Sequence, residues 1–253
     1  MISVIVLGTG NVGTHLISTF LKTNKVTLLQ VYSRKKQSLI PFEKNVDTTD
    51  CIQHLKEADV YIIAIADDAI ANFSSQLKFK DKLVVHTSGS ASINALKNNG
   101  HKGVFYPLQT FSKKQPVDFK NIPICLETER KGDMQLLKKL ANSISERIYT
   151  IDSHQRKRLH VAAVFSNNFV NFMYKLANDI CDEYHIPFEI LQPLILETAQ
   201  KISTHHPVAI QTGPARRNDT KTINAHLQLL SGQPKEIYQL ITQSILKTYG
   251  KKL

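Results

Sequence analysis

The sequence predicts a doubly wound, mostly parallel α/β sheet followed by an all-helical region. Apolar runs of strand length alternate with helical periodicity over residues 2–151, which is the pattern of such a sheet. A glycine-rich turn follows the first run, and from Lys157 onward long helical periodicities continue with almost no strand signal. We therefore expect two domains, at residues 1–152 and 153–253.

The first elements form one strand-helix-strand unit. Residues 2–7 are an unbroken apolar run, as expected of a parallel strand covered on both faces. After a turn at residues 8–13, apolar side chains recur at helical spacing through residue 21. Residues 26–32 supply a second strand, within the roughly 30 residues that a βαβ unit needs.

The alternation then continues to residue 151. Further strands are expected at residues 60–66, 83–86, 103–106, 122–126 and 147–151. Helices are expected near residues 50–56, 69–76 and 134–144.

The second domain is expected to open with one long helix at residues 156–184. This helix is apolar on nearly every side, so it must be covered all round. The remaining helices of the domain are too few to cover it alone. We therefore expect a homodimer, with a second copy of the chain completing the cover through the C-terminal helical domain.

Charge and cysteine content exclude several classes of protein. The formal net charge is +11, but Lys and Arg are dispersed in short clusters. This dispersed pattern favours an ordinary solvated surface over a face that binds nucleic acid. Binding of an anionic small molecule is an intermediate interpretation. Cys51, Cys125 and Cys181 have the spacing of neither a zinc site nor a disulfide framework, so we expect no metal and reduced thiols.

The sequence also favours a cytoplasmic protein without a membrane segment. The chain starts directly with its first apolar strand, without the basic start and cleavage site of a secretory signal. No apolar run approaches the roughly 20 residues that a membrane span needs.

A glycine-rich turn joins the first strand to the first helix. Its backbone can approach a pyrophosphate, whose charge is favoured by free N–H groups and the helix dipole. A tight turn without ligand is the alternative, but the flanking strand and helix favour binding. We therefore expect a Rossmann-like dinucleotide-binding domain, with a phosphate loop formed by Gly8, Thr9, Gly10, Asn11, Val12 and Gly13.

The end of the second strand favours NADP over NAD. An NAD site usually carries Asp or Glu at this point to bind the ribose hydroxyls. This chain has Ser33 and Arg34 instead. A hydroxyl and a guanidinium suit a 2′-phosphate, although an ordinary basic loop is the alternative.

Small and polar residues follow other predicted strands. Because ligands of open α/β sheets lie at the carboxyl ends of the strands, these residues are candidates for contact with ribose and nicotinamide, with simple turn chemistry as the alternative. They are Ala64, Ile65, Ala66, Thr87, Ser88 and Gly89. Gln109 and Thr110, after the next strand, are candidates for the wall of a substrate cleft.

The long helix carries a polar stripe. With α-helical geometry, His160, Asn167 and Asn171 fall within about 20° of one line, and Asn168 lies beside it. Buried imidazoles and amides need partners, in the core, at an interface or in a ligand. If the partner is a ligand, His160 would donate a proton, Asn167 or Asn168 would orient the reacting carbonyl or the carboxamide, and Asn171 would contact the substrate.

A second polar cluster lies at residues 213–219. Arg216 there is a candidate for binding an anionic substrate, with pairing at an interface as the alternative.

Three stretches resemble a known group of oxidoreductases. They are YPLQTFS (106–112), LHVAAVFSNNFVN (159–171) and GPARRND (213–219). The chain resembles, over essentially its whole length, the group that includes 6-phosphogluconate dehydrogenase, pyrroline-5-carboxylate reductase and prephenate dehydrogenase. It resembles more closely a branch of NADP oxidoreductases with a C-terminal domain of unknown function.

The resemblance implies a dinucleotide domain joined to a helical dimerisation domain. In 6-phosphogluconate dehydrogenase and its relatives, the first helix of the second domain presents a lysine and, one turn later, an asparagine. The matching pairs here are Ala163 with Asn167 or Val164 with Asn168, so the lysine is missing in either register.

Together these observations predict an NADP-dependent oxidoreductase. It would transfer hydride between nicotinamide and a small, anionic carbonyl or imine substrate, or a hydroxy or amino substrate in the reverse direction. The alternative is a non-catalytic NADP-binding sensor or partner-organising protein, which the missing lysine favours.

Overall fold

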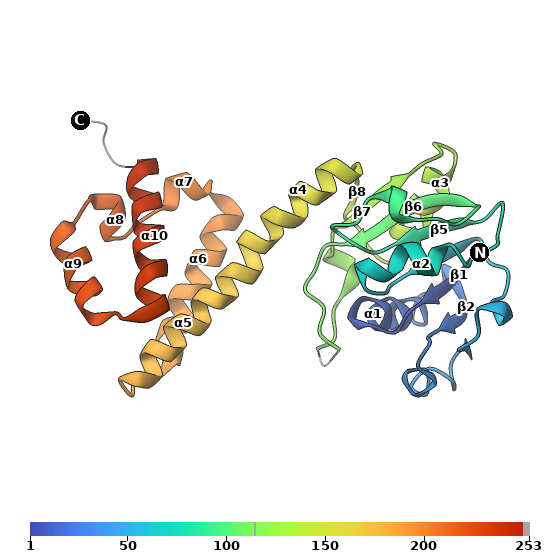
Figure 1. The fold of residues 1–253 in the computed structure, drawn as a ribbon, viewed down its shortest axis with the longest axis horizontal. Helices are drawn as coiled ribbons and strands as arrows, with labels where there is room; N and C mark the ends of the chain where they lie inside the picture. The colour runs from blue at the N-terminus through green and yellow to red at the C-terminus, as the bar shows by residue number, and fades with distance from the viewer. Residues whose placement is uncertain (114, 250–253) are drawn as a thin grey trace. The chain divides into compact units, whose positions relative to one another are not determined.

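The fold is seen in a computed structural model that describes residues 1–113 and 115–249 (Figure 1). The strands of these residues are β1 (Ile2–Leu7), β2 (Val26–Tyr32), β3 (Asp47–Thr49), β4 (Val60–Ile63), β5 (Leu83–His86), β6 (His101–Pro107), β7 (Ile124–Thr128) and β8 (Ile148–Thr150). They form one sheet in the order β3-β2-β1-β4-β5-β6-β7-β8. Neighbouring strands are parallel except β6 and β7, which confirms the predicted doubly wound, mostly parallel sheet.

Helices cover the sheet and make up the C-terminal region. They are α1 (Asn11–Phe20), α2 (Ile70–Ser74), α3 (Asp133–Asn142), α4 (Ser153–Ala163), α5 (Val170–Glu183), α6 (Gln192–Thr204), α7 (Pro207–Ile210), α8 (Pro214–Arg217), α9 (Thr220–Leu229) and α10 (Gly232–Tyr249). The chain divides into two compact units, Met1–Val164 and Phe165–Leu253. The first unit therefore includes α4 and ends twelve residues beyond the boundary expected after residue 152.

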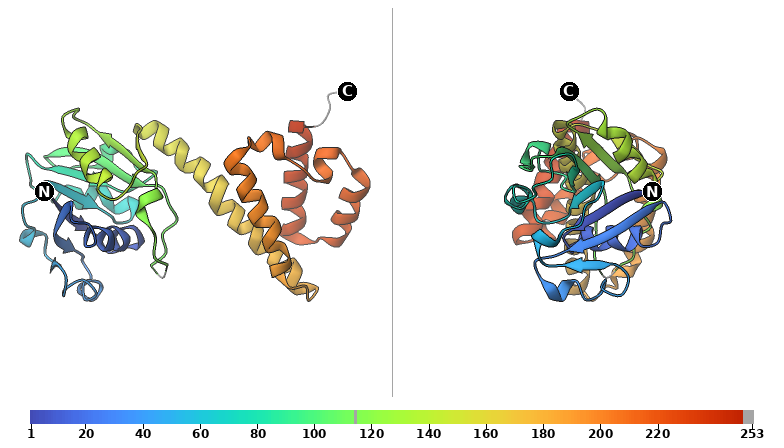
Figure 2. Two further views of the ribbon diagram at one scale, coloured as in Figure 1. Left: turned by 180° about the vertical axis from the view of Figure 1, so that it is seen from behind. Right: turned by 90° about the vertical axis from the view of Figure 1, so that its right-hand side faces the viewer.

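Alternation along β1 explains why the sheet is covered on both faces. Val4 and Val6 point into a core shared with α1 and α3, whereas Ile5 and Leu7 point into a core shared with α2. All four side chains are fully buried. The two layers of helices can be followed in Figures 1 and 2.

The region between β2 and β4 differs from the prediction. The helix expected near residues 50–56 is a single 3₁₀ turn at Ile52–His54, and a short strand, β3, precedes it. Its residues, Asp47 to Thr49, are polar because β3 lies at the edge of the sheet and pairs only with β2. A polar three-residue strand has no hydrophobic periodicity by which it could be recognised.

The long helix predicted at residues 156–184 contains a π-helical turn. The chain continues from α4 through a π-helix at Val164–Phe169 into α5. A π-turn contains one more residue than an α-turn, so an α-helical projection does not extend across it. The predicted alignment of His160 with Asn167 and Asn171 on one line is therefore wrong, although all three residues lie on this helical stretch.

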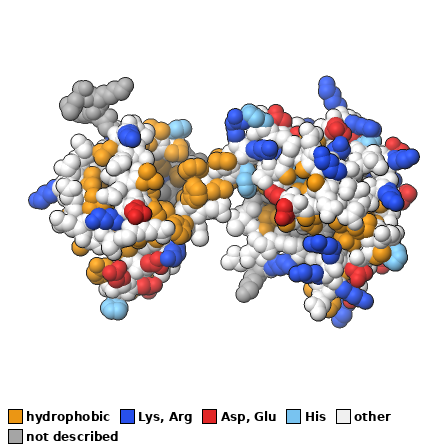
Figure 3. All heavy atoms as spheres, in the orientation of Figure 1, with side chains coloured by type: hydrophobic (Ala, Val, Ile, Leu, Met, Phe, Trp, Pro, Cys, Tyr) orange, Lys and Arg blue, Asp and Glu red, His pale blue; other side chains and the backbone are white. Residues whose placement is uncertain are grey.

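The surface agrees with the dispersed charge of the sequence. On the face shown in Figure 3, Lys and Arg side chains are distributed over the first unit rather than gathered in one stripe. In the part of the chain that the structure describes, none of the helices has the length and apolar character needed to cross a bilayer.

Candidate functional site

The phosphate loop is shaped by two glycines that have no room for a side chain. Gly8 has φ +120°, and a Cβ there would overlap the carbonyl oxygen of Ala64, the residue directly after β4. A Cβ on Gly13 would overlap the carbonyl of Gly8 itself. These close contacts let α1 begin directly against the carboxyl ends of β1 and β4, as a dinucleotide loop requires.

Gly10 differs from these two glycines because it has space around it. A Cβ on Gly10 would be 3.7 Å from the Ala64 oxygen, an ordinary contact distance. Gly10 is also the N-cap of α1 and has no side chain with which to bond the first N–H groups. The bare start of the helix can therefore receive an anion such as a pyrophosphate.

A pocket of about 570 Å³ lies over this loop. It is formed where the strand order reverses between β1 and β4, the usual ligand position in an open α/β sheet. The predicted cofactor residues that line it are Gly8, Thr9, Gly10, Asn11, Val12, Ser33, Arg34, Ala64, Ile65, Ala66 and Thr87. The tight packing of the glycines below the pocket and its polar rim fit a dinucleotide.

Three hydroxyl groups gather at the β2 end of the pocket. Thr9 Oγ1 lies 3.2 Å from Ser33 Oγ and 2.8 Å from Ser38 Oγ, and the two serine oxygens are 2.8 Å apart. Arg34 and Lys35 line the pocket beside this hydroxyl cluster of Thr9, Ser33 and Ser38. Hydroxyl donors and cations together provide the chemistry of a phosphate site.

The sequence analysis missed several residues of this pocket. Ser38 is not identified there, because this residue is five positions beyond Ser33 in the sequence. The two serines become neighbours only when the turn between them folds back. The further lining residues that it did not name are Tyr32, Lys35, Ile52, Ala69, Asn72, Phe73, Gln76 and Lys113.

Gly13, Ser88 and Gly89 lie near the pocket but do not line it among the described residues. Gly13 packs beneath the loop, as described above. Gly89 packs against two side chains, since a Cβ there would lie 2.7 Å from His160 Nδ1 and 2.7 Å from Tyr106 Cζ. The absence of a side chain at Gly89 is therefore what lets this pair approach the loop after β5.

His160 and Tyr106 form a polar pair inside the first unit. Tyr106 Oη is 3.2 Å from His160 Nδ1, and the two rings meet edge to face at 69°. Burial raises the pKa of Tyr106 to about 12, with a smaller contribution from Cys125. The phenol therefore stays protonated at neutral pH and can either donate to a neutral imidazole or accept from an imidazolium.

The loop after β5 is held from two sides. Asp67 accepts hydrogen bonds from Ser88 Oγ at 2.7 Å and Ser90 Oγ at 2.5 Å. Beneath the loop, His86 Nδ1 accepts from the Ser88 N–H at 3.2 Å, which leaves Nε2–H to donate to the Ser92 carbonyl at 3.2 Å. Both contacts therefore assign a neutral imidazole to His86.

The pKa of His86 is consistent with that assignment. Burial, followed by the nearby positive charge of Arg156, lowers it to about 4. His86 is fully buried. The imidazole is therefore a fixed structural support at neutral pH.

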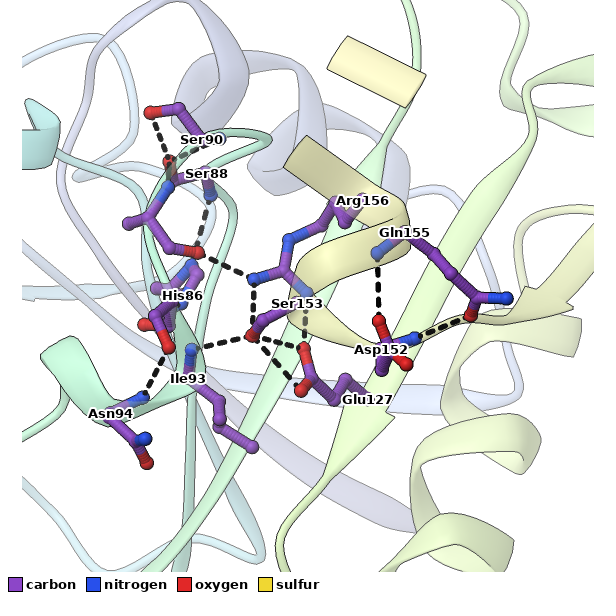
Figure 4. Close-up of polar contacts among 12 residues, drawn as sticks. His86, Ser88, Ser90, Ile93, Asn94, Glu127, Asp152, Ser153, Gln155 and Arg156 are labelled. Atoms are coloured by element: carbon purple, nitrogen blue, oxygen red, sulfur yellow. Dashed lines mark hydrogen bonds and ion pairs between the residues drawn. The ribbon is translucent and has the colours of Figure 1, made fainter. Parts of the chain in front are cut away.

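Arg156 joins α4 to the sheet and to the same loop (Figure 4). Its fully buried side chain forms an ion pair with Glu127 on β7 and donates to the Ala91 carbonyl at 2.5 Å. Ser153 completes the network, with its Oγ 2.8 Å from Glu127 Oε2 and accepting from the Ile93 N–H at 3.0 Å. Because His160 lies one helical turn after Arg156, this network fixes His160 over the loop that contains Gly89.

The other predicted residues lie elsewhere. Gln109 and Thr110 are exposed beyond β6, and Gln109 Oε1 accepts from the Thr110 N–H at 2.8 Å. Asn167 and Asn168 are exposed in the π-helical turn, and Asn171 is exposed at the start of α5, all in the second unit. Their predicted contacts with substrate and cofactor stay predictions.

Arg216 has a partner within the second unit. Its guanidinium lies 5.1 Å from the centre of the Tyr249 ring, and Nη1 donates to the Tyr249 carbonyl at 3.4 Å. The predicted role of Arg216 in substrate binding is not tested by this contact. Across residues 1–113 and 115–249, no group of three or more His, Cys, Asp and Glu side chains is arranged to hold a metal ion.

Two family models match the chain. Residues 3–89 match the family described as NADP oxidoreductase, coenzyme F420-dependent. Residues 122–245 match a domain of unknown function (DUF2520). No curated protein matches the sequence.

Solved structures are similar over different shares of the chain. A Bacteroides fragilis protein provisionally described as an NADP oxidoreductase is 38% identical, with a TM-score of 0.87, over 97% of this chain and 98% of that one. An imine reductase from Myxococcus stipitatus in complex with NADP⁺ is 17% identical over 98% and 96%, with a TM-score of 0.67. Prephenate dehydrogenase from A. aeolicus, in complex with hydroxyphenyl propionate and NAD⁺, is 12% identical over 62% of each chain, with a TM-score of 0.53. The last two similarities indicate a shared fold.

Proposed function

We propose, from the premise that this chain belongs to the NADP oxidoreductase family, that it transfers hydride between NADP and a small organic substrate. NADP is the cofactor of this family, as the sequence predicts. The proposed substrate is an anionic carbonyl or imine compound, or its hydroxy or amino counterpart. The formal net charge of +11 favours an anion.

The pocket over the phosphate loop is the observation that carries this proposal. Gly8 and Gly13 have no room for a side chain there, whereas Gly10 lines the pocket at the start of α1 and has room for a Cβ. We assign the pyrophosphate to this turn and the 2′-phosphate to Arg34, Lys35 and the hydroxyl cluster. NADPH, when bound, supplies the hydride.

We assign the transfer of the proton to His160. Its Nδ1 is engaged by Tyr106, so Nε2 is the nitrogen that we direct at the oxygen or nitrogen of the substrate. Tyr106 can hold the imidazole before and after it gives up its proton, because the phenol both donates and accepts. This pair provides an acid-base group where the lysine of related families is missing, and it favours an enzyme over a non-catalytic sensor.

We also propose that the protein is a homodimer. Large apolar side chains remain open to solvent along α4, the π-helical turn and α5. Val161 is 56% exposed, Phe165 64% and Phe169 49%. We propose that a second copy of the chain packs against these exposed apolar side chains. Sedimentation should give a dimer for the native chain and a monomer for Phe165→Glu, whereas a native monomer would overturn the proposal.

The proposed function is tested by binding followed by turnover. Calorimetry should show that NADPH binds more tightly than NADH, and a panel of keto acids, imines and aldehydes should include a compound that consumes NADPH absorbance. His160→Ala and Asn167→Ala should each abolish turnover while leaving NADPH binding intact. His154→Ala, a change of an exposed histidine on the same helix, should leave both unaffected. Failure of both cofactors to bind would overturn the proposal.

A further inference from the structure

We propose that Lys113 is a third cation for the 2′-phosphate of NADP, and that His15 holds the loop that presents it. The inference rests on the cofactor assignment made above and adds a residue that comes from the loop after β6. The phosphate site would then be closed by parts of the chain that lie on either side of α1.

The position of Lys113 follows from two cavities. The dinucleotide pocket is lined by Thr9, Ser38 and Lys113, among others. The same three residues line a neighbouring cavity of about 420 Å³ beside α1. Lys113 therefore lies at the boundary between the cavities, as do Thr9 and Ser38, whose hydroxyl oxygens are 2.8 Å apart.

The loop before Lys113 is fastened to α1. His15 is 8% exposed, and its Nε2 lies 2.9 Å from the carbonyl oxygen of Ser112, so Nε2–H donates to that oxygen. The His15 ring also packs on Phe111 with ring centres 5.2 Å apart, and Phe111 stacks on Phe119 at 5.7 Å. Lys113 thus follows two residues that are fixed to the helix whose N-terminus forms the phosphate loop.

The charges around the hydroxyl cluster make this placement selective. Arg34 and Lys35 reach the pocket from the end of β2, and Lys113 reaches it from the loop after β6. A 2′-phosphate between them would interact with cations from two directions, whereas the 2′-hydroxyl of NAD would gain little from the third charge. Lys113 should therefore contribute to the preference for NADP and not to dinucleotide binding in general.

Calorimetry of two neutral variants tests the inference. Lys113→Gln should weaken NADPH binding about threefold to fivefold, which is the range of an exposed charge pair, and should change NADH binding by less than about twofold. Lys36→Gln is the matched control, because Lys36 is an exposed lysine that directly follows Arg34 and Lys35 but does not line the pocket among the described residues. It should change neither affinity by more than about twofold.

His15 provides a second test with an internal control. His15→Phe keeps an aromatic ring against Phe111 but removes the donor to Ser112, so it should lower the NADPH-to-NADH affinity ratio in the same direction as Lys113→Gln. In the double variant, the loss of NADPH affinity should be smaller than the sum of the losses in the two single variants. The reason is that His15 acts through the position of the Lys113 ammonium group, which the double variant lacks.

The outcomes distinguish this inference from the function on which it rests. Equal weakening of NADPH and NADH by Lys113→Gln, or no change in either, would overturn the inference while the cofactor assignment stood. Failure of the native chain to bind either cofactor would overturn the proposed function and the inference with it.

Discussion

The phosphate loop and the α4 anchor, the network of Arg156, Glu127 and Ser153, are two polar sites of the first unit that are built differently. The loop is formed by backbone, with glycines that pack closely below and a pocket above. The anchor is formed by side chains, with Arg156 fully buried against Glu127. A backbone site is therefore sensitive to added atoms, whereas a buried ionic site is sensitive to a lost partner. The following experiments test that difference.

The largest expected effect is the loss of the buried cation. Arg156→Met leaves Glu127 without its partner and should lower the free energy of unfolding by about 3–5 kcal/mol, measured in urea at pH 7. Adding Glu127→Gln should restore part of this loss, because no unpaired charge then remains. Arg158→Met, at an exposed position of the same helix, should have an effect below about 0.5 kcal/mol. Equal stability of the Arg156 and Arg158 variants would contradict the anchor.

A smaller effect should appear in the pH dependence of stability. His86 has a pKa of about 4 in the folded protein and 6.5 as its ordinary value. Between these values the unfolded chain binds a proton that the folded chain does not. The free energy of unfolding should therefore be unaffected by this group above pH 6.5 and fall by about 3 kcal/mol as the pH is lowered to 4.

His86→Gln identifies the source of that slope. The amide can still accept from Ser88 and donate to Ser92, but it does not titrate. Urea unfolding of this variant should depend less on pH between 4 and 6.5 than that of the native protein. The same slope in both proteins would assign the effect to other groups.

Substitutions at two glycines of the phosphate loop should have different effects, one mainly on the stability of the fold and the other mainly on NADPH binding. Gly13→Ala forces a methyl group against the Gly8 carbonyl and should cost about 1–3 kcal/mol of stability in thermal unfolding. Gly10→Ala fits the fold and should cost less than about 1 kcal/mol, yet it should weaken NADPH binding more than about tenfold by filling the approach to the helix. Tight NADPH binding by Gly10→Ala would contradict the proposed position of the pyrophosphate.

The smallest expected effect is at the first turn of α4. The Asp152 side chain accepts a hydrogen bond from the Gln155 N–H at 2.7 Å. In turn, Gln155 Oε1 accepts a hydrogen bond from the Asp152 N–H at 3.1 Å. Asp152→Ala should therefore cost about 1 kcal/mol in urea unfolding, and Asp152→Ser should retain most of the stability. An equal loss in both variants would show that the cap does not act through its hydrogen bond.

The same comparison explains what the sequence could predict. Alternating apolar runs and a glycine turn act through local backbone geometry, so the sheet and the pocket-lining residues Gly8 and Arg34 could be found from neighbours along the chain. The Tyr106–His160 pair could not, because its members are 54 residues apart and meet only through the packing of α4 beside β6. His160 was singled out from an α-helical stripe, whereas its observed contact is with Tyr106.

Two further differences have the same origin. The π-helical turn at Val164–Phe169 leaves no simple mark in a sequence of apolar and polar residues, so a uniform helix is the default expectation. Nothing in the sequence pattern marks Arg156, and only the position of Glu127 across the sheet explains its burial. Contacts between distant segments therefore account for most of what the sequence pattern missed.

Deuterium transfer tests the central claim most directly. NADPH labelled with deuterium at the transferred C4 position is incubated with the native protein and the substrate panel, and the products are analysed by mass spectrometry. The account predicts deuterium on the reduced carbon of a product with the native protein, and none with His160→Ala despite intact NADPH binding. NADPH consumption without deuterium in any product would contradict hydride transfer to the substrate.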